Sequence, residues 1–495
     1  MSIDPTRIPV LVGIGQSIER EAVVDVVGLA SRAARAAFED APGMVDRIGR
    51  LTMVASSFSR VSKTPATEVM VDLGLEDVEC EVTRPGGNTP QWLINRACVE
   101  ITRGELETTL ICGAEATRSM KLSEPDSDFL TAAAQSLSDA DGDADPIVGA
   151  SLRGMLSQAE IHARLFRPAD TYPIFESVLA ARAGASPAQW RIRLGELLSR
   201  ASEVAAKNPF AWFPEVRTPG EIATPSKNNR VTAEPYTKLM NSFANVDLGC
   251  ALLVTNWAVA RELGLDDQCV FPLSGANTSD IAPTMRRDLG GSPAIRAAAA
   301  ASFEAVGSGV DEMDFIDLYS CFPVAVEVGA AEMGLAIDDS RGLTLTGGMS
   351  FFGGPGNNYT SHGIAAAALR LREAGRYAYV SGNGGLLSKH SIGIYGNEPA
   401  ATGFVFADTS STQAEIELSA LEVAHEAEGE ATVVAGTVVY DRAGEVVAAP
   451  VIATLADGRR VMATADPSQL ADLTGQSLVG ETVRVSGSSP PNYAL

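Results

Sequence analysis

From residue 1 to about residue 400, apolar and polar positions follow a pattern typical of a layered α/β protein. Short apolar runs at 9–15, 48–56 and 108–112 have the length of strands and end in or beside glycine or other small residues. Residues 23–40 instead repeat their apolar positions at the helical period. This β-α-β order predicts an α/β domain with a mostly parallel sheet.

A glycine-rich unit lies near the end of this region. Residues 342–391 predict a glycine-rich loop, a helix, a turn, a strand at 377–381 and a second glycine-rich loop. Thr360 or Ser361 is expected to cap the helix and Gly375 to end it. Two such loops beside one helix N-terminus leave backbone N–H groups able to face a ligand, so the unit is predicted to frame a binding site.

A weaker copy of the same unit occupies residues 84–116. It contains Gly86 and Gly87, followed by a helix for which Thr89 is the expected cap and Pro90 the first residue. A buried strand follows that helix, as it does in the later unit. A repeat of this length indicates that the chain contains two related α/β halves.

Two other regions depart from this pattern. Between the halves, residues 208–236 are rich in proline and turn residues and predict a loop domain that forms a lid over a site. Near the C-terminus, β-type runs at 431–440, 446–455 and 459–464 predict a small antiparallel barrel or sandwich of OB-like type. The predicted domains are residues 1–117 with 246–268 for the first half, 118–245 for the insertion, 269–405 for the second half and 412–495 for the tail.

The composition is that of an ordinary globular protein with more than one domain. The 495 residues exceed the ~250–300 that one core usually supports, and 45% are apolar against 20% charged. A net charge of −24 argues against a nucleic-acid partner and against adhesion to an anionic membrane. It does not exclude an anionic ligand, because a local cluster of donors outweighs a distant acidic surface.

The scattered cysteines and the lack of an evident secretory signal or membrane span predict a cytoplasmic protein. The six cysteines are scattered without a CxxC pair, which indicates reduced thiols and not a disulfide framework. The first residues lack a basic segment followed by an apolar one, and no apolar run approaches the ~18 residues of a membrane span. A cytoplasmic protein without membrane insertion is therefore expected.

Common cofactor signatures are missing from the sequence. Gly13 and Gly15 form a Gly-x-Gly without the third glycine of a dinucleotide fingerprint, and no Gly-Lys-Ser/Thr or Gly-x-Ser-x-Gly occurs. The four histidines have no metal-ligand spacing. We expect no metal, nicotinamide or flavin cofactor.

Four segments carry a more specific pattern: EPYTKLMNSFANVDLGCALLVT at 234–255, DLYSCF at 317–322, GGMSFFGGP at 347–355 and SGNGG at 381–385. With the duplicated halves they resemble the thiolase superfamily, and within it the sterol-carrier-protein type of thiolase, over roughly residues 6–400. The resemblance implies a five-layered α-β-α-β-α fold with an extra C-terminal domain. It also implies an acetyl-CoA acetyltransferase-like protein of lipid metabolism, with coenzyme A or acyl-CoA as substrate or ligand.

The residues that carry out the family's chemistry are replaced. In that family a cysteine at the N-terminus of the first-half helix attacks the acyl-CoA, and the histidine of a Gly-His-Pro motif activates it. The matching positions here are Gly86 and Gly354. The family's Asn-Glu-Ala-Phe motif, or His-Asp-Cys-Phe in the sterol-carrier type, reads Tyr-Ser-Cys-Phe at 319–322, and 381–385, where the family has its last catalytic cysteine or histidine, contains neither. A glycine can neither form an acyl-enzyme nor accept a proton. Ordinary thiolysis or Claisen condensation is therefore not expected from these positions.

Four side chains are candidates for catalysis. Tyr319, at a predicted strand end, and Tyr359, in the loop that carries the family's base, can act as general acids or bases, or they can be packed tyrosines with satisfied hydroxyls. His362, in the first turn of the second-half helix, can reach the pocket or can serve as a capping group. Asn88 can supply an oxyanion donor or can be an ordinary loop residue before a helix.

Ligand binding is expected to use basic and glycine residues. Lys227, Arg230 and Lys238 belong to the insertion, which lines the CoA channel in the family, where cations meet phosphates. Solvated lid charges are the alternative interpretation. The glycines expected to leave room for a flat thioester and to offer it backbone donors are Gly353, Gly382, Gly384 and Gly385.

Three functions remain open at this point. The resemblance implies an acyltransferase, which needs an unrecognised nucleophile. A retro-aldol lyase on a β-hydroxyacyl-CoA needs a base and an enolate site but no acyl-enzyme, and some thiolase-like proteins work in this way with tyrosines and an OB-fold partner. The third is a non-catalytic acyl-CoA-binding protein whose tail is an interaction module. The family usually pairs through the first half, so the expected state is a monomer or a homodimer.

Overall fold

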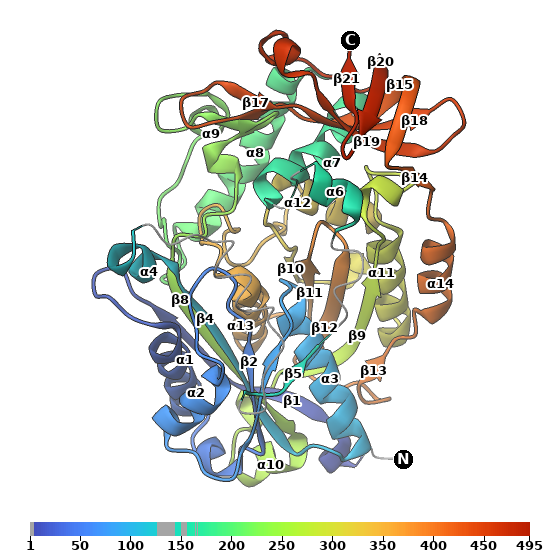
Figure 1. The fold of residues 1–495 in the computed structure, drawn as a ribbon. Helices are drawn as coiled ribbons and strands as arrows, with labels where there is room; N and C mark the ends of the chain where they lie inside the picture. Colours follow the sequence, from blue (N-terminus) through green and yellow to red (C-terminus); the bar gives the residue numbers. More distant parts are fainter. Residues whose placement is uncertain (1–3, 126–143, 150–155, 164, 166) are drawn as a thin grey trace.

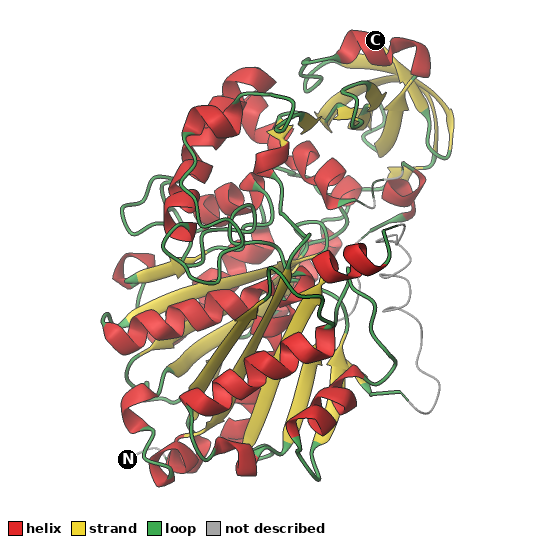
Figure 2. Ribbon diagram, turned by 90° about the vertical axis from the view of Figure 1, so that its left-hand side faces the viewer, coloured by secondary structure: helices red, strands yellow, loops and turns green. Residues whose placement is uncertain are grey.

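Two mixed β-sheets and the helices between and around them form the larger part of the molecule (Figure 1). The computed structural model describes residues 4–125, 144–149, 156–163, 165 and 167–495. A helical insertion lies beyond one end of the sheets, and the C-terminal strands lie beyond the insertion, at the opposite end of the molecule from the N-terminus (Figure 2).

The first sheet contains six described strands and is mostly parallel, as the sequence predicted, with one reversed strand. Strand β8, which returns from the insertion, lies between β1 and β4 and runs antiparallel to both of them. The remaining pairs in this sheet are parallel. The strands in spatial order are β1 (Pro9–Ile18), β8 (Asp247–Asn256), β4 (Thr108–Ala116), β2 (Arg50–Val54), β3 (Glu79–Thr83) and β5 (Ile147–Val148).

The second sheet is also mixed. Two antiparallel hydrogen-bond ladders form its centre, and parallel pairs occur only at its two edges among the described residues. The strands in spatial order are β10 (Phe315–Asp317), β11 (Tyr377–Gly384), β12 (Lys389–Gly396), β9 (Phe271–Ser279) and β13 (Val405–Phe406). Strand β11 extends through the glycines that the sequence placed in a loop, so Gly382 and Gly384 are strand residues.

The helices complete five layers in the order α-β-α-β-α, which confirms the predicted architecture (Figure 1). Helices α3 (Thr89–Arg103) and α13 (Tyr359–Glu373) pack against each other and contact strands of both sheets. Helices α1 (Val26–Asp40) and α2 (Pro65–Leu73) cover the first sheet, and α11 (Pro293–Val306) and α12 (Pro323–Glu332) lie beside the second. The two copies of the glycine-rich unit thus contribute the two central helices.

The Gly-x-Gly of the first strand has a packing role. A side chain at Gly15 would begin 1.9 Å from the Ala33 carbonyl oxygen, and one at Gly13 would begin 2.7 Å from that of Ala37. Both carbonyls belong to α1, which therefore lies against the backbone of β1. Only glycine permits this approach, so the motif serves helix–sheet contact.

The insertion is mainly helical. Its buried side chains share a hydrophobic core with the loops that follow β10 and precede α13, so the insertion is packed onto the second half. Its described elements are α4 (Thr117–Ser123), α6 (Gln158–His162), α7 (Pro168–Arg182), α8 (Pro187–Ala205), α9 (Pro219–Ala223), β6 (Val231–Ala233) and β7 (Tyr236–Thr237).

The C-terminal strands close into a barrel, as the sequence predicted. The order is β15-β18-β19-β21-β20 and back to β15, with β19 and β21 parallel, an order typical of OB folds. The last strand was not predicted from the sequence. The elements are β14 (Val423–Ala424), β15 (Glu426–Gly436), β18 (Pro450–Leu455), β19 (Arg460–Ala465), the 3-10 helix η8 (Pro467–Leu473), β20 (Thr482–Ser488) and β21 (Asn492–Ala494).

The barrel is joined to the insertion by a shared sheet and by hydrogen bonds to Glu234, which forms a buried ion pair within the insertion. The hairpin of β16 (Val439–Tyr440) and β17 (Val446–Ala448) pairs with β6. Glu234 accepts hydrogen bonds from Arg191 Nη2 at 2.6 Å and from the Tyr440 hydroxyl at 3.1 Å, while its carbonyl accepts from Thr437 Oγ1 at 2.8 Å. These contacts fix the barrel against the outer side of the insertion.

The ion pair generates a stability prediction. Glu234→Ala leaves the buried Arg191 guanidinium without its carboxylate, which we expect to cost about 3–5 kcal/mol in the free energy of unfolding measured with urea. The matched variant Tyr440→Phe removes one hydrogen bond to the same carboxylate and should cost about 1 kcal/mol. Equal losses in the two variants would contradict the stabilising role of the ion pair.

Candidate functional site

The N-terminus of α3 is the point where residues of both halves converge. The Thr360 hydroxyl of α13 donates to the Gly87 carbonyl at 2.6 Å, and the Gly86 N–H donates to Asn357 Oδ1 at 2.9 Å. Asn358 Nδ2 in turn donates to the Gly113 carbonyl of β4 at 2.7 Å. These hydrogen bonds between the two repeated units hold the beginnings of the two central helices together.

The helix starts differ from those predicted. Asn88 and Asn358 occupy the cap positions of α3 and α13, and neither side chain makes a capping hydrogen bond. Thr360 and Ser361 lie inside the first turn of α13, and the Ser361 hydroxyl donates to Asn358 Oδ1. Of the side chains that the sequence assigned to capping, Thr360 instead connects the two halves, while Ser361 and Thr89 hydrogen-bond within their own halves.

Tyr319 lies directly on the backbone of Gly87. A side chain at Gly87 would begin 2.0 Å from the Tyr319 hydroxyl oxygen and 2.5 Å from the Asn383 carbonyl oxygen. Among the described residues, the hydrogen bond of Tyr319 is made by its backbone N–H, which donates to Ser381 Oγ at 3.1 Å, and not by its hydroxyl. Burial raises the pKa of Tyr319 well above its usual value, so the hydroxyl stays protonated and is available as a donor.

Tyr359 supports Tyr319 from the side. The two rings meet edge to face, with centroids 5.6 Å apart. The Tyr359 hydroxyl is already engaged, at 2.6 Å from Thr346 Oγ1 and 2.9 Å from Ser320 Oγ. Burial raises its pKa as well. Of the two predicted tyrosines, Tyr319 therefore has the available hydroxyl and Tyr359 positions its ring.

His362 and Asn88 have different surroundings from each other. His362 is buried with Nδ1 2.7 Å from Gln16 Oε1 and with its ring against Phe352, and burial lowers its pKa to about 3. It is therefore a neutral histidine that faces β1. Asn88 Nδ2 donates to Ser391 Oγ at 3.1 Å, which leaves Oδ1 buried without a described partner, so Asn88 presents an acceptor where a donor was predicted.

The position that matches the family's nucleophile is occupied by an amine. A side chain at Gly86 would begin 2.9 Å from Lys389 Nζ and 2.7 Å from Asn88 Oδ1. Lys389 is buried at the start of β12, and its Nζ donates to the Pro85 carbonyl at 2.9 Å. Burial, with the nearby Arg84 cation as the smaller cause, lowers the pKa of Lys389 to about 8.

Lys389 was not predicted as a site residue from the sequence. The available signal was a lysine directly after the second glycine-rich loop, at the head of an otherwise apolar strand. Its location follows from the register of β11 and β12, which pairs Lys389 with Gly384. A side chain at Gly384 would begin 3.2 Å from the Gly86 Cα and the Lys389 Cε. Because Gly384 has no side chain, the lysine can extend to the start of α3.

No thiol in the chain is suited to acyl transfer. Burial raises the pKa of Cys321 to about 12, and five of the six cysteines are buried, with Cys80 half-buried. At the position of the family's histidine, a side chain at Gly354 would begin 2.2 Å from Ser242 Oγ. The Gly354 N–H donates to the Phe243 carbonyl at 2.8 Å. A segment of the insertion therefore fills the space of the family's base.

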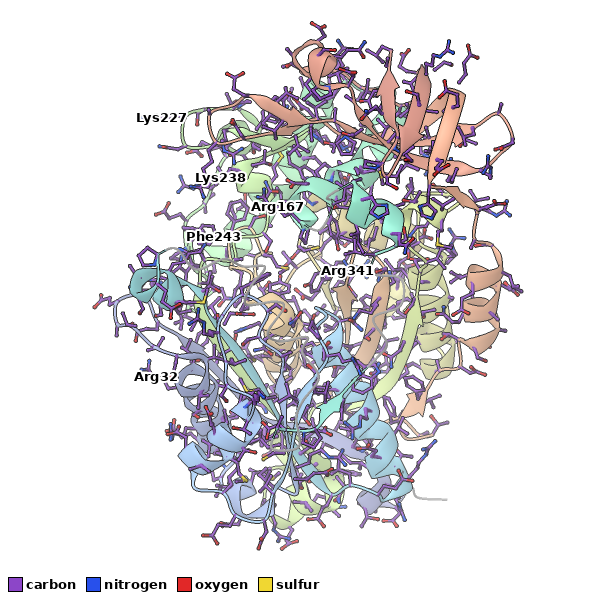
Figure 3. All side chains as sticks on the ribbon, viewed as in Figure 1. Arg32, Arg167, Lys227, Lys238, Phe243 and Arg341 are labelled. Carbon is purple, nitrogen blue, oxygen red and sulfur yellow. The ribbon has the colours of Figure 1, made fainter. Side chains whose placement is uncertain are left out.

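The predicted binding residues lie in two places. Lys227 and Lys238 are exposed on the same flank of the insertion (Figure 3). Arg230 is half-buried and, with Arg167, lowers the pKa of Asp170 while burial raises it more strongly. Of the glycines, Gly382 and Gly384 pack on Asn88, whereas Gly353 lies against Val246 and Leu248 and the Gly385 carbonyl accepts from the Tyr172 hydroxyl at 3.1 Å.

Two searches of the described residues were negative. No group of three or more histidine, cysteine, aspartate or glutamate side chains there could hold a metal ion. Within the same residues, no helix is long and apolar enough to cross a membrane.

Comparison with known proteins gives matches to thiolase-like proteins. A family model described as the additional C-terminal domain of thiolase-like protein type 1 matches residues 413–488. The crystal structure of a monomeric SCP2-thiolase-like protein type 1 from Mycobacterium smegmatis has 31% sequence identity and a TM-score of 0.84, with 100% of each chain covered. No curated protein matches the chain by sequence.

Two more distant structures share the fold alone. An Ltp2-ChsH2(DUF35) aldolase has 18% identity and a TM-score of 0.61, and the alignment covers 79% of this chain and 98% of that one. An acetyl-CoA acetyltransferase from Syntrophomonas wolfei has 14% identity and a TM-score of 0.57, with 79% and 100% covered.

The two glycines at the start of α3 differ in what surrounds them, and this can be tested with matched variants. At Gly86 the nearest atoms are ends of flexible side chains, so Gly86→Ala should change the free energy of unfolding by less than about 1 kcal/mol. At Gly87 the obstacles include a backbone carbonyl, so Gly87→Ala should cost about 1–3 kcal/mol. Urea unfolding measures both, and a Gly87→Ala variant as stable as Gly86→Ala would contradict the close contact with Tyr319.

Proposed function

The chain belongs to the family of SCP2-thiolase-like proteins of type 1 within the thiolase superfamily, and from this membership we propose that it binds a coenzyme A thioester at the N-terminus of α3 without forming a thiol-bound acyl-enzyme. The acyl group would lie against the backbone of Gly86 and Gly87. The observation that carries the proposal is that three polar groups, the Lys389 amine, the Asn88 amide oxygen and the Tyr319 hydroxyl, converge on this helix start, while no thiol or histidine occupies the family's positions.

The charges of the insertion support binding of the nucleotide part of coenzyme A. Lys227 and Lys238 are exposed cations on a protein whose net charge is −24, and Arg230 is close to them in sequence. Phosphates are held by such charge-assisted contacts. We infer a channel that starts at these cations and ends at α3.

A retro-aldol lyase is the second candidate, because one tyrosine hydroxyl is placed for it. Cleavage of a β-hydroxyacyl-CoA requires a base at the β-hydroxyl and a donor at the thioester oxygen, where the enolate charge develops. The protonated Tyr319 hydroxyl at the positive end of α3 is suited to the second task. The shared fold with an aldolase is consistent with this reading.

The remaining assignments follow from the same premise. The glycines at 86 and 354 disfavour ordinary acetyltransferase chemistry. If the lyase reaction does not occur either, the chain is a non-catalytic acyl-CoA-binding protein. We infer a cytoplasmic monomer active in lipid metabolism, and its barrel acts within the chain as a partner of the insertion. We also propose that the domains are residues 1–117 with 246–268, 118–245, 269–405 and 412–495.

Binding is tested by calorimetry with acetoacetyl-CoA on the full chain. We expect a Kd below about 1 mM, and a roughly 30-fold weaker Kd for Lys227→Ala combined with Lys238→Ala, because each of the two lost charge-assisted contacts costs about 1 kcal/mol. Arg103→Ala, at the far end of α3, is the control and should bind like the unmodified chain. No heat of binding at millimolar ligand would rule out the binding function.

The lyase reading is tested with a panel of β-hydroxyacyl-CoA thioesters by following release of an aldehyde or ketone. Tyr319→Phe should lower the rate by about 10²-fold or more, because a general acid contributes about that factor. Tyr377→Phe, at the first residue of β11, is the control and should leave the rate unchanged. Equal turnover by Tyr319→Phe and the unmodified chain would remove Tyr319 from the mechanism. If no thioester in the panel releases an aldehyde or ketone, the lyase function is excluded and the chain is a non-catalytic acyl-CoA-binding protein.

A further inference from the structure

We propose that Lys389 is a carbonyl-reactive amine, and that this site captures a ketone or aldehyde, such as the keto group of a β-ketoacyl thioester, as an imine. The proposal takes from the proposed function only the position of the acyl group at the start of α3. It adds a covalent step by a residue that the family's motifs do not include.

The first support is position. The amine lies 2.9 Å from the point where a nucleophile's side chain would begin at Gly86, so a group directed to the family's attack site meets Nζ. The lysine is held there by strand β12, whose ladder with β11 pairs Lys389 with Gly384. Its hydrogen bond to the Pro85 carbonyl uses one of the three ammonium protons.

The second support is that the amine is buried without a counter-ion among the described residues. Lys389 is 3% exposed, and no carboxylate forms an ion pair with it among the described residues. A buried cation without a counter-ion tends to lose its proton. Burial and Arg84 lower its pKa to about 8, so about half of the molecules carry the neutral amine at pH 8, against less than about 1% for a lysine with the ordinary pKa of about 10.4. Desolvation next to another cation is a known way to make lysine nucleophilic.

The third support is the set of polar groups around the amine. Asn88 Oδ1 is buried without a described partner and lies 2.7 Å from the same point above Gly86. It can accept a hydrogen bond from the amine or from a hydroxyl on the attacked carbon. On the adjacent Gly87, the Tyr319 hydroxyl is protonated and lacks a described acceptor. The site therefore holds a nucleophile, an acceptor and a donor around two consecutive glycines.

The reaction balances without a further reagent. Neutral Nζ forms a C–N bond to the carbonyl carbon while the carbonyl oxygen receives a proton from Tyr319, which gives a carbinolamine. The amine then loses its two protons, one returning to Tyr319 and one leaving with the hydroxyl as water, and the C–O bond breaks as the C=N bond forms. The sum is one carbonyl compound and one amine converted to one imine and one water.

The test is reductive trapping on the full chain. The protein is incubated with acetoacetyl-CoA, or separately with the acetoacetyl thioester of N-acetylcysteamine, which lacks the nucleotide, and sodium borohydride is added. Peptide mass spectrometry should find the reduced adduct mainly at Lys389. Trapping should rise from pH 6 to pH 9 with a midpoint near 8, because the neutral amine increases as pH passes the pKa.

Variants and probes separate the possible outcomes. Lys389→Arg and Lys389→Met should both abolish the adduct while thermal unfolding shows that they are folded, and Lys207→Arg, an exposed control, should retain it. Adducts spread over exposed lysines, or none at Lys389 with either probe, would overturn the proposal even if calorimetry shows CoA binding. If the N-acetylcysteamine thioester is trapped at Lys389 but calorimetry shows no CoA binding, the reactive amine is confirmed and the proposed CoA-binding function is refuted.

Discussion

The structure depends on a close approach of four chain segments at the first residues of α3. Gly86 and Gly87 have no side chains, and the Lys389 amine and the Tyr319 hydroxyl occupy the space that such side chains would need. Any larger residue at 87 would displace a tyrosine hydroxyl and a strand carbonyl. This constraint explains why the helix start carries glycine, and it places an amine and a phenol beside two consecutive glycines at the N-terminus of α3.

The rest of the molecule holds these two groups in position. The Tyr172 hydroxyl of α7 binds the Gly385 carbonyl, the Leu387 N–H and Asn383 Nδ2, so the insertion fixes the loop between β11 and β12 that leads to Lys389. The Tyr172 ring stacks on Phe322, which follows the Tyr319 loop. The outer side of α7 packs against β15 of the barrel. The C-terminal domain thus packs on the helix, α7, whose Tyr172 holds the loop that leads to Lys389.

The sequence predicted the architecture because the information there is periodic and repeated. The duplicated glycine-rich unit, the apolar strands and the β-type tail led to the five layers and the barrel. The reversed direction of β8 was not predicted, because this strand follows a long insertion and no local pattern tells whether such a strand runs parallel to its neighbours. The helix caps were mispredicted because Thr360 hydrogen-bonds to Gly87 in the other half, a contact that local rules do not contain.

The site was predicted in part. The sequence placed Tyr319 at a strand end and identified the missing thiol, but it did not predict the contact of Tyr319 with the helix start. It also could not distinguish the free hydroxyl of Tyr319 from the engaged one of Tyr359, which depends on Ser320 and Thr346. It missed Lys389, whose importance follows from strand register. The most direct test of the account is a crystal structure of the full chain with acetoacetyl-CoA. We predict the thioester or keto carbonyl within about 4 Å of both Lys389 Nζ and the Tyr319 hydroxyl; a ligand bound elsewhere, with both groups still packed on the glycines, would contradict the account.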